Sequence, residues 1–331
     1  MFTTLAASYD CCRALHREHG RTYYLATRLL PAWKRRHVHA LYGFTRYTDE
    51  IVDRLNGASP AQRAASLRRW TARFAAALDG GPVNHPVLPA VLHTIAVFDL
   101  DRADFAAFLR SMEMDLYVTE YPTYDDLLDY MAGSAAAIGT MMLPILGASD
   151  LARAREPARQ LGLAFQLTNF IRDIGEDCER GRIYLPGKDL AEFGVTPDDL
   201  RAGVATGPVR RLVAFEVDRA REHYARAAPG IPLLAVGSQA CIRTAFRLYG
   251  GILDEVERAG YDVFQRRATV PYRRRLAGLA ASVLTRPGRP VRLPTGDRVP
   301  AAGDRLPAAS DRVPAASDRV PASSDPKGQA A

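Results

Sequence analysis

LGLAFQLTNFIRDIGEDCERGRIYLP, residues 161–186, carries the strongest structural signal in the chain. Four amide- or carboxylate-bearing residues recur in it at steps of three, four and four: Gln166, Asn169, Asp173 and Asp177. Such steps align side chains along one face of an α-helix, and the opposite face here is apolar. Because unpaired carboxylates are costly inside a core, the polar face must meet partners or a solvent-filled cavity. Arg172 within the stretch and Arg182 after the helix offer donors for phosphate oxygens.

A second acidic pair lies upstream, in LYGFTRYTDEIVD, residues 41–53. Asp49 and Asp53 are four apart in a helical pattern, and Arg46 shares nearly the same face. Two like charges repel unless a cation sits between them, and oxygen ligands favour magnesium, which also bridges to substrate phosphates. A solvated acidic patch would explain one such pair alone. Together with the pair in residues 161–186, it predicts two acidic helices that face each other across a magnesium-lined mouth for diphosphates.

A third acidic group, Asp125, Asp126 and Asp129, has a DDxxD shape and competes for the metal role. It begins directly after a turn, where acidic residues are favoured by the helix dipole alone. Thr123, three residues before Asp126, matches a helix N-cap, so we assign this group to capping.

The segment YMAGSAAAIG, residues 130–139, is unusual for its small side chains within a helical pattern. Small side chains let either a neighbouring helix or a long hydrocarbon ligand approach the backbone closely. Tight helix packing and a ligand cavity are therefore both open interpretations of this segment.

Residues from about 8 to 285 are predicted to form successive helices, because Ala, Leu and Arg are abundant and apolar residues recur three or four apart. Farther along, a seven-residue unit of the type DRVPAAS occurs four times, beginning at Asp297. Each unit contains a proline, which removes a helical hydrogen bond and argues against a coiled coil. We therefore expect an all-α, single-domain fold over residues 1–285 and a disordered Pro/Arg/Asp repeat tail over residues 286–331.

Composition narrows the class of protein. The net charge of +7 is spread between two regions rather than packed into one run. It suits an anionic ligand or a membrane surface, although a solvated face is the commoner explanation, and we predict no nucleic-acid partner. The four cysteines indicate reduced thiols, and the N-terminus lacks an export-signal pattern. The longest weakly polar run, residues 131–147, falls short of the about 20 apolar residues that span a bilayer. We expect a cytoplasmic protein with no obligate protein partner; peripheral association with the inner face of the membrane stays open.

Three blocks together resemble the squalene and phytoene synthase family over roughly residues 8–285: RYTDEIVD (46–53), YMAGSAAAIG (130–139) and the stretch at 161–186. The resemblance implies the isoprenoid synthase fold, with a central cavity between two aspartate-rich helices. The sequences of two segments, residues 41–53 and residues 19–31 (HGRTYYLATRLLP), are most similar to those of bacterial phytoene synthases.

The same resemblance implies roles for individual side chains. The magnesium ligands would be Asp49, Asp53, Asp173 and Asp177, with Asn169 beside them. Diphosphate would be held by Arg46, Arg172, Arg267 and, in a phosphate-side flap, Thr22. The reaction centre would be lined by Tyr130, Gln166, Tyr184 and Tyr249. Gly20 departs from the serine often found in the flap, and Arg266 is an alternative to Arg267.

The activity implied by the resemblance is head-to-head condensation of two geranylgeranyl diphosphates, through a cyclopropyl (prephytoene) diphosphate, to phytoene in carotenoid biosynthesis. Mg²⁺ is the implied cofactor, with Mn²⁺ as a substitute, and no NADPH is expected because this product needs no reductant. Squalene or dehydrosqualene synthesis from farnesyl diphosphate is an alternative, since those enzymes share the metal motifs. A non-catalytic prenyl-diphosphate-binding scaffold is a second alternative, against which the presence of all four motif aspartates argues.

Overall fold

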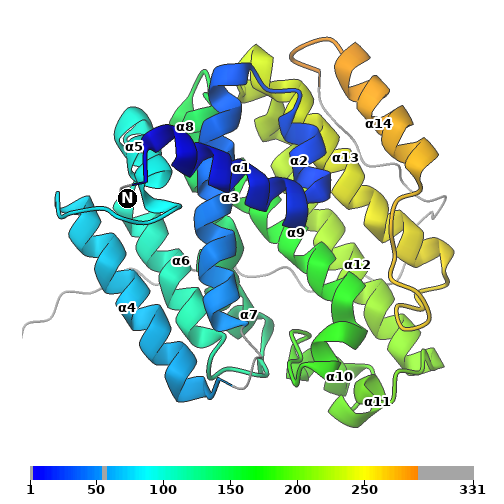
Figure 1. Ribbon diagram of the computed structural model, residues 1–331. Coiled ribbons are helices and arrows are strands. Elements are labelled where there is room, and N and C mark those ends of the chain that lie inside the picture. Colours follow the sequence, from blue (N-terminus) through cyan, green and yellow to red (C-terminus); the bar gives the residue numbers. More distant parts are fainter. Residues whose placement is uncertain (1–2, 54–57, 290–331) are drawn as a thin grey trace, which may run out of the picture. The chain divides into compact units, whose positions relative to one another are not determined.

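The computed structural model describes residues 3–53 and 58–289, and within these ranges the chain is helical and has no β-strand (Figure 1). Its longer helices are α1 (Leu5–His19), α3 (Ala32–Val52), α4 (Pro60–Leu78), α5 (Leu88–Phe98), α6 (Arg102–Met114), α8 (Ala137–Leu146), α9 (Leu151–Glu179), α12 (Gly207–Ala227), α13 (Val236–Arg258) and α14 (Tyr272–Leu284). Shorter segments are α2 (Arg21–Thr27), α7 (Tyr124–Met131), the π-helix η1 (Ala132–Ala136), α10 (Gly187–Glu192), α11 (Pro197–Arg201) and the 3-10 helix η2 (Ala228–Leu233). The all-α prediction is confirmed, whereas the expected tail beyond residue 289 lies outside the described residues.

Helix starts follow the local sequence. At α7, Thr123 Oγ1 accepts a hydrogen bond from the backbone N–H of Asp126 at 3.2 Å, and the Asp126 carboxylate accepts from the backbone N–H of Thr123 at 2.9 Å. This reciprocal capping box confirms the assignment of Asp126 to a helix start. Asp150 caps the long helix α9 in a related way, accepting from the backbone N–H of Arg153 at 3.0 Å.

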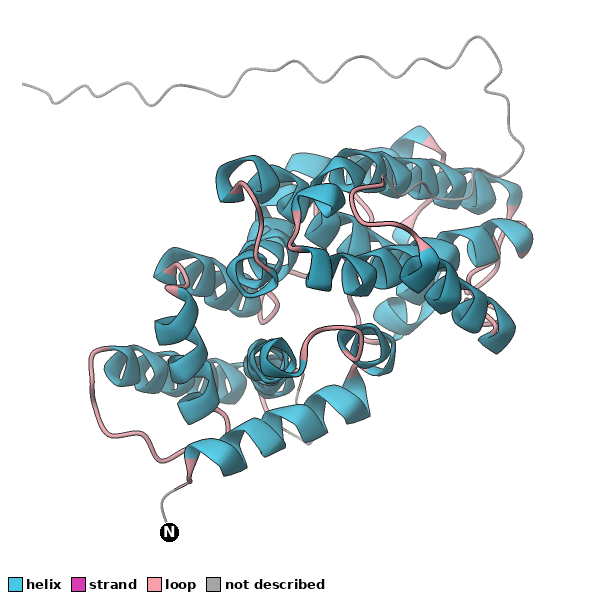
Figure 2. Ribbon diagram, turned by 90° about the horizontal axis from the view of Figure 1, so that it is seen from above, coloured by secondary structure: helices cyan, strands magenta, loops and turns pink. Residues whose placement is uncertain are grey.

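The helices enclose two hydrophobic cores. The first lies among α1, α3, α4, α5, α6 and α8, where the aromatic rings of Phe44, Phe74 and Phe105 meet at centroid distances of 4.7 to 5.4 Å. The second lies among α7, α9, α12 and α13, around the fully buried Tyr224. Figure 2, a view from above, shows helices and loops and no strand in the described part of the chain. Of the helices in the described part, none combines the length and apolar character that a membrane crossing requires.

Small residues bring the helices between the two cores into backbone contact. An ideal Cβ added at Gly133 would lie 2.0 Å from the Ala107 carbonyl oxygen, and one at Gly139 would lie 2.3 Å from that of Ala158. These distances are too short for any side chain, so α6, η1, α8 and α9 pack as closely as their backbones allow. Helix packing is therefore one use of the segment 130–139.

Candidate active site

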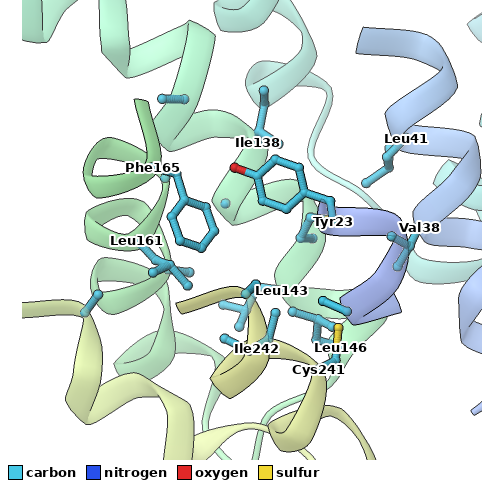
Figure 3. Close-up of a pocket in the computed structure, with 18 of the residues that line it drawn as sticks. Tyr23, Val38, Leu41, Ile138, Leu143, Leu146, Leu161, Phe165, Cys241 and Ile242 are labelled. Atoms are coloured by element: carbon cyan, nitrogen blue, oxygen red, sulfur yellow. The ribbon is translucent and has the colours of Figure 1, made fainter. Parts of the chain in front are cut away.

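A cavity of about 300 Å³ is lined by residues from both cores (Figure 3). Figure 3 shows Leu143, Leu146 and Ile242 gathered in its apolar part, and the rings of Tyr23 and Phe165 together, with centroids 5.6 Å apart. The wall includes a limited set of polar side chains: His16, Tyr23, Thr27, Tyr42, Thr45, Ser134, Gln166 and Asn169. Four members of the small-residue segment also line it, namely Ser134, Ala135, Ile138 and Gly139, so that segment serves both helix packing and the cavity.

The polar stripe predicted on α9 leads out of this cavity. Gln166 and Asn169 belong to the wall, and Asn169 Oδ1 is buried without a hydrogen-bond partner. Asp173 lies one turn farther along α9, where the Nε groups of Arg172 and Arg267 contact its Oδ1 at 2.8 and 2.9 Å. One helix face thus joins an apolar chamber to a cluster of charged groups.

The upstream acidic pair, Asp49 and Asp53, lies at the C-terminal end of α3. Arg46 Nη1 donates to Asp49 Oδ2 at 3.0 Å, and Asp53 is the C-cap residue of the helix. Arg182, in the segment that follows α9, reaches Asp53 Oδ1 with its Nη1 at 3.3 Å. The chain after α9 therefore returns to the end of α3 and connects the surroundings of the two pairs.

A buried carboxylate that sequence reasoning missed, Asp115, lies in the same region. It follows α6, and its Oδ2 accepts from the Tyr130 hydroxyl at 2.9 Å. Its Oδ1 accepts from the Tyr184 hydroxyl at 3.3 Å, and its backbone oxygen accepts from Arg182 Nη2 at 3.0 Å. No second acid at helical spacing accompanies it, so the sequence offers no spacing signal that would have found it. We call Asp49, Asp53, Asp115, Asp173 and Asp177 the acidic mouth.

Three carboxyl groups of the acidic mouth have raised pKa values. Burial, and after it the charge of the neighbouring motif aspartate, raise the pKa of Asp49 to about 7 and that of Asp177 to about 7. Burial likewise raises the pKa of Asp115 to about 6. The Arg182 charge opposes all three shifts, so this guanidinium lies near both acidic pairs. A divalent cation would relieve the same repulsion, because it favours the ionised carboxylates.

The donor chemistry fits magnesium. Carboxylates and one amide oxygen are hard oxygen ligands, and the unpartnered Oδ1 of Asn169 supplies the amide. In the described ranges, no three acidic, histidine or cysteine side chains are already gathered around one point as in a formed metal site. Arginine guanidinium groups lie against the carboxylates instead, in the pairs with Asp49, Asp53 and Asp173.

Known proteins resemble this chain in sequence and in fold. A profile of the squalene/phytoene synthase family matches residues 16–274. The chain belongs to the squalene/phytoene synthase family. The 15-cis-phytoene synthase of Synechococcus elongatus is 36% identical over 293 residues, which cover 85% of this chain and 94% of that protein. The phytoene synthase of Arthrospira platensis is 38% identical over 280 residues, covering 81% and 90%. A solved dehydrosqualene synthase in complex with a ligand is similar with a TM-score of 0.78 and 28% identity, covering 84% of this chain and 96% of that one.

Three tyrosines predicted from the resemblance to this family lie outside the wall of the cavity. Tyr130 and Tyr184 converge on Asp115, and the Tyr184 ring stacks on Phe170 with centroids 4.0 Å apart. Tyr249, on α13, stacks on Tyr23 at 4.4 Å. Among the four residues predicted to line the reaction centre, Gln166 alone lines the cavity.

The predicted flap of this synthase-family chain spans the junction of α1 and α2, where Gly20 separates the two helices. Thr22 is half-buried on α2, which packs against α13. Tyr23, the next residue, faces the cavity and was not foreseen. Tyr42 was missed as well, although it precedes Arg46 by four residues and so shares its helical face.

Proposed function

We propose that this chain joins two geranylgeranyl diphosphates head to head, through prephytoene diphosphate, and releases phytoene. The observation that carries the proposal is the continuity of α9. Its Gln166 and Asn169 line an apolar chamber, and its Asp173 and Asp177 follow on the next turns. A substrate with a long hydrocarbon tail and a diphosphate head requires these two environments side by side.

The ionic residues divide into two roles under this proposal. The metal would be held by Asp49, Asp53, Asn169, Asp173 and Asp177. Bound Mg²⁺ supplies positive charge that stabilises the diphosphate as it leaves. The diphosphate oxygens would be bound by Thr22, Arg46, Arg172 and Arg267, whose guanidinium groups suit paired phosphate contacts.

The apolar wall and the tyrosines govern the carbon chemistry. Departure of one diphosphate leaves an allylic cation, which the double bond of the second substrate attacks, and proton loss closes the cyclopropane. A second ionisation, rearrangement and proton loss give phytoene. The apolar wall would exclude water that would quench the cations. The rings of Tyr130, Tyr184 and Tyr249 would stabilise positive charge; the hydroxyls of Tyr130 and Tyr184 contact Asp115 of the acidic mouth, and this supports their part of the assignment.

The direct test is incubation of the purified protein with Mg²⁺ and geranylgeranyl diphosphate, without NADPH, followed by analysis of the lipid extract. Phytoene is the expected product. Farnesyl diphosphate, with and without NADPH, is run in parallel, because the structural similarity to a dehydrosqualene synthase makes that shorter substrate the second candidate. Squalene or dehydrosqualene as the main product would overturn the choice of substrate, and binding without turnover would favour the scaffold.

We also propose that the protein associates peripherally with anionic membranes through α14. Tyr272, Leu276 and Leu284 on this helix are exposed by 72%, 47% and 81%, and the exposed Arg273 lies beside them. Sedimentation with anionic vesicles should carry the protein down, and replacing Leu276 and Leu284 by Ser should abolish this. Val204→Ser is a matched control, because this valine is exposed elsewhere in the chain. Equal sedimentation of all three proteins would exclude this face.

A further inference from the structure

The register of α9 against η1 and α8 shows where the cavity ends. An ideal Cβ at Gly162 would lie 2.4 Å from the Ala135 carbonyl oxygen. Farther along α8, one at Gly139 would lie 2.3 Å from the carbonyl oxygen of Ala158, which is earlier on α9. The helices therefore run antiparallel, so the C-terminal end of α8 lies beside the first turns of α9. Asn169, later on α9, lines the opposite end of the cavity, next to the acidic mouth.

The cavity is closed at the end away from the acidic mouth. Leu146, the last residue of α8, belongs to the cavity wall, and Figure 3 shows it in the apolar part. Three more wall residues from other segments are buried like Leu146, namely Leu30, Ala154 and Leu234. Burial of all four side chains leaves no opening to solvent among them. A hydrocarbon tail that enters from the acidic mouth therefore stops here.

The length of the wall along α9 suits a tail of four isoprene units. The wall residues of this helix extend from Ala154 to Asn169, which corresponds to about 22 Å at a rise of about 1.5 Å per residue. An extended isoprene unit contains four carbon–carbon bonds of about 1.5 Å and measures about 5 Å, so three units span about 15 Å and four about 20 Å. A tail of three units leaves the closed end unfilled, and a tail of five units collides with it.

A buried lysine holds Leu146 in place. Lys34, on the first turn of α3, is 6% exposed, and its Nζ donates to the backbone oxygen of Leu146 and, at 3.0 Å, to Ser238 Oγ on α13. The Ser238 hydroxyl donates to the same backbone oxygen at 2.6 Å. A cation is favoured at the C-terminal end of a helix, where backbone carbonyls lack helical partners. Because Val38, one turn later on α3, lines the cavity, the lysine braces the closed end from the same helix.

We propose that Leu146, held in place by Lys34, limits the prenyl tail of the substrate to four isoprene units. The inference rests on the proposed function, from which it takes the placement of the substrate, with the diphosphate at the acidic mouth and the tail along α9. Leu146 is then a specificity-determining residue, and Lys34 is a positioning residue that acts through it. Both lie at the end opposite the acidic mouth, so they decide which tail binds and leave the chemical steps unchanged.

Isothermal titration calorimetry with unreactive thiolodiphosphate analogues, in the presence of Mg²⁺, tests this limit. Farnesyl, geranylgeranyl and geranylfarnesyl analogues carry three, four and five isoprene units. In the wild-type protein, affinity should rise by at least about tenfold from three units to four, because the fourth unit buries apolar surface. It should fall by at least about tenfold from four units to five, because a closed wall resists overfilling. Equal affinity for four and five units would overturn the inference.

Substitutions at the closed end should move the limit. Leu146→Ala should bind the five-unit analogue as tightly as the wild-type protein binds the four-unit one. Leu146→Phe should lose at least about tenfold in affinity for the four-unit analogue and keep wild-type affinity for the three-unit one. Lys34→Met keeps an apolar stem and removes the donors, so its preference for four units over five should fall below about threefold. Leu67→Ala is the matched control, because this buried leucine lies on α4 and is not part of the cavity wall.

The variants and the wild-type series give separate answers. A wild-type tail preference in Leu146→Phe would remove Leu146 as the limit, and one in Lys34→Met would remove the role of the lysine. If Leu146→Ala fails to fold, Leu146→Phe and the wild-type series decide. A shift of the limit in Leu67→Ala would contradict the assignment to the closed end. Failure of the proposed function gives a different pattern, because geranylgeranyl diphosphate would then yield no phytoene while the binding series still breaks after four units.

Discussion

Two acidic groups in this chain share a residue type and differ in their surroundings. On α7, Asp125, Asp126 and Asp129 are exposed, and Asp126 completes a capping box. In the acidic mouth, burial and neighbouring negative charge raise the pKa of Asp49 and of Asp177 to about 7. The DDxxD spacing on α7 is the more familiar metal motif, yet its carboxylates are already satisfied by solvent and backbone. Burial and like-charge neighbours, rather than spacing alone, mark carboxylates that require a cation.

The largest expected effect separates these two groups directly. Asp173→Asn and Asp49→Asn should each lower turnover by at least about 100-fold, because a lost metal ligand removes several kcal/mol of charge stabilisation. Folding should be preserved, since each change also removes repulsion between neighbouring carboxylates. The checks are steady-state assays and thermal unfolding. Asp125→Asn on α7 is the control and should keep wild-type activity; near-normal turnover in either mouth variant would reject the metal assignment.

Competition between protons and Mg²⁺ for the carboxylates of the acidic mouth provides a second test of the difference between the two acidic groups. Because the pKa of Asp49 and of Asp177 is raised to about 7, their ionised fractions fall as the pH drops from 7.5 to 5.5. Protonated carboxyls do not bind the cation, so affinity for Mg²⁺ in the presence of pyrophosphate should weaken by at least about tenfold over this range. Isothermal titration calorimetry at several pH values measures it. An affinity that is constant with pH would contradict the raised pKa values.

Much of this arrangement was predictable from the sequence because helices impose a simple period. Residues on one helix, such as Gln166, Asn169 and Asp173, share a face in the structure as their spacing indicated. Thr123 and Asp126 form the capping interaction that their spacing indicated, because capping depends on residues within one turn of the helix start. Such local patterns need no knowledge of tertiary packing.

Features that depend on separate helices were not predictable in this way. Asp115 is a single acid at the end of α6, and its meeting with Tyr130 and Tyr184 depends on how three segments pack. The stacking of His16 on Tyr42 across α1 and α3 is of the same kind. A helical period constrains neighbours along one helix and carries no information on which helices meet.

Replacing Asp115 should lower turnover less than replacing a predicted metal ligand. Asp115→Asn keeps an acceptor for the tyrosine hydroxyls but removes a charge close to Asp53 and Arg182. Turnover should fall by about tenfold, equivalent to about 1.4 kcal/mol, because the guanidinium and both rings lose part of their orientation. Kinetic assays of Asp115→Asn beside Tyr130→Phe measure this. Identical kinetics in Asp115→Asn and wild type would remove Asp115 from the mouth as a functional group.

The smallest predicted effect comes from a substitution at the start of α7, which should change stability and leave activity unchanged. Thr123→Ala removes the hydroxyl that accepts from the Asp126 backbone N–H at 3.2 Å, so the free energy of unfolding should fall by about 1 kcal/mol. Urea unfolding followed by circular dichroism measures the loss. Turnover and Mg²⁺ affinity should match the wild type, because the capping box is exposed and its carboxylates contribute no metal ligand. A loss of Mg²⁺ affinity in Thr123→Ala would instead give the DDxxD group on α7 a share in metal binding and erase the distinction between the two acidic groups.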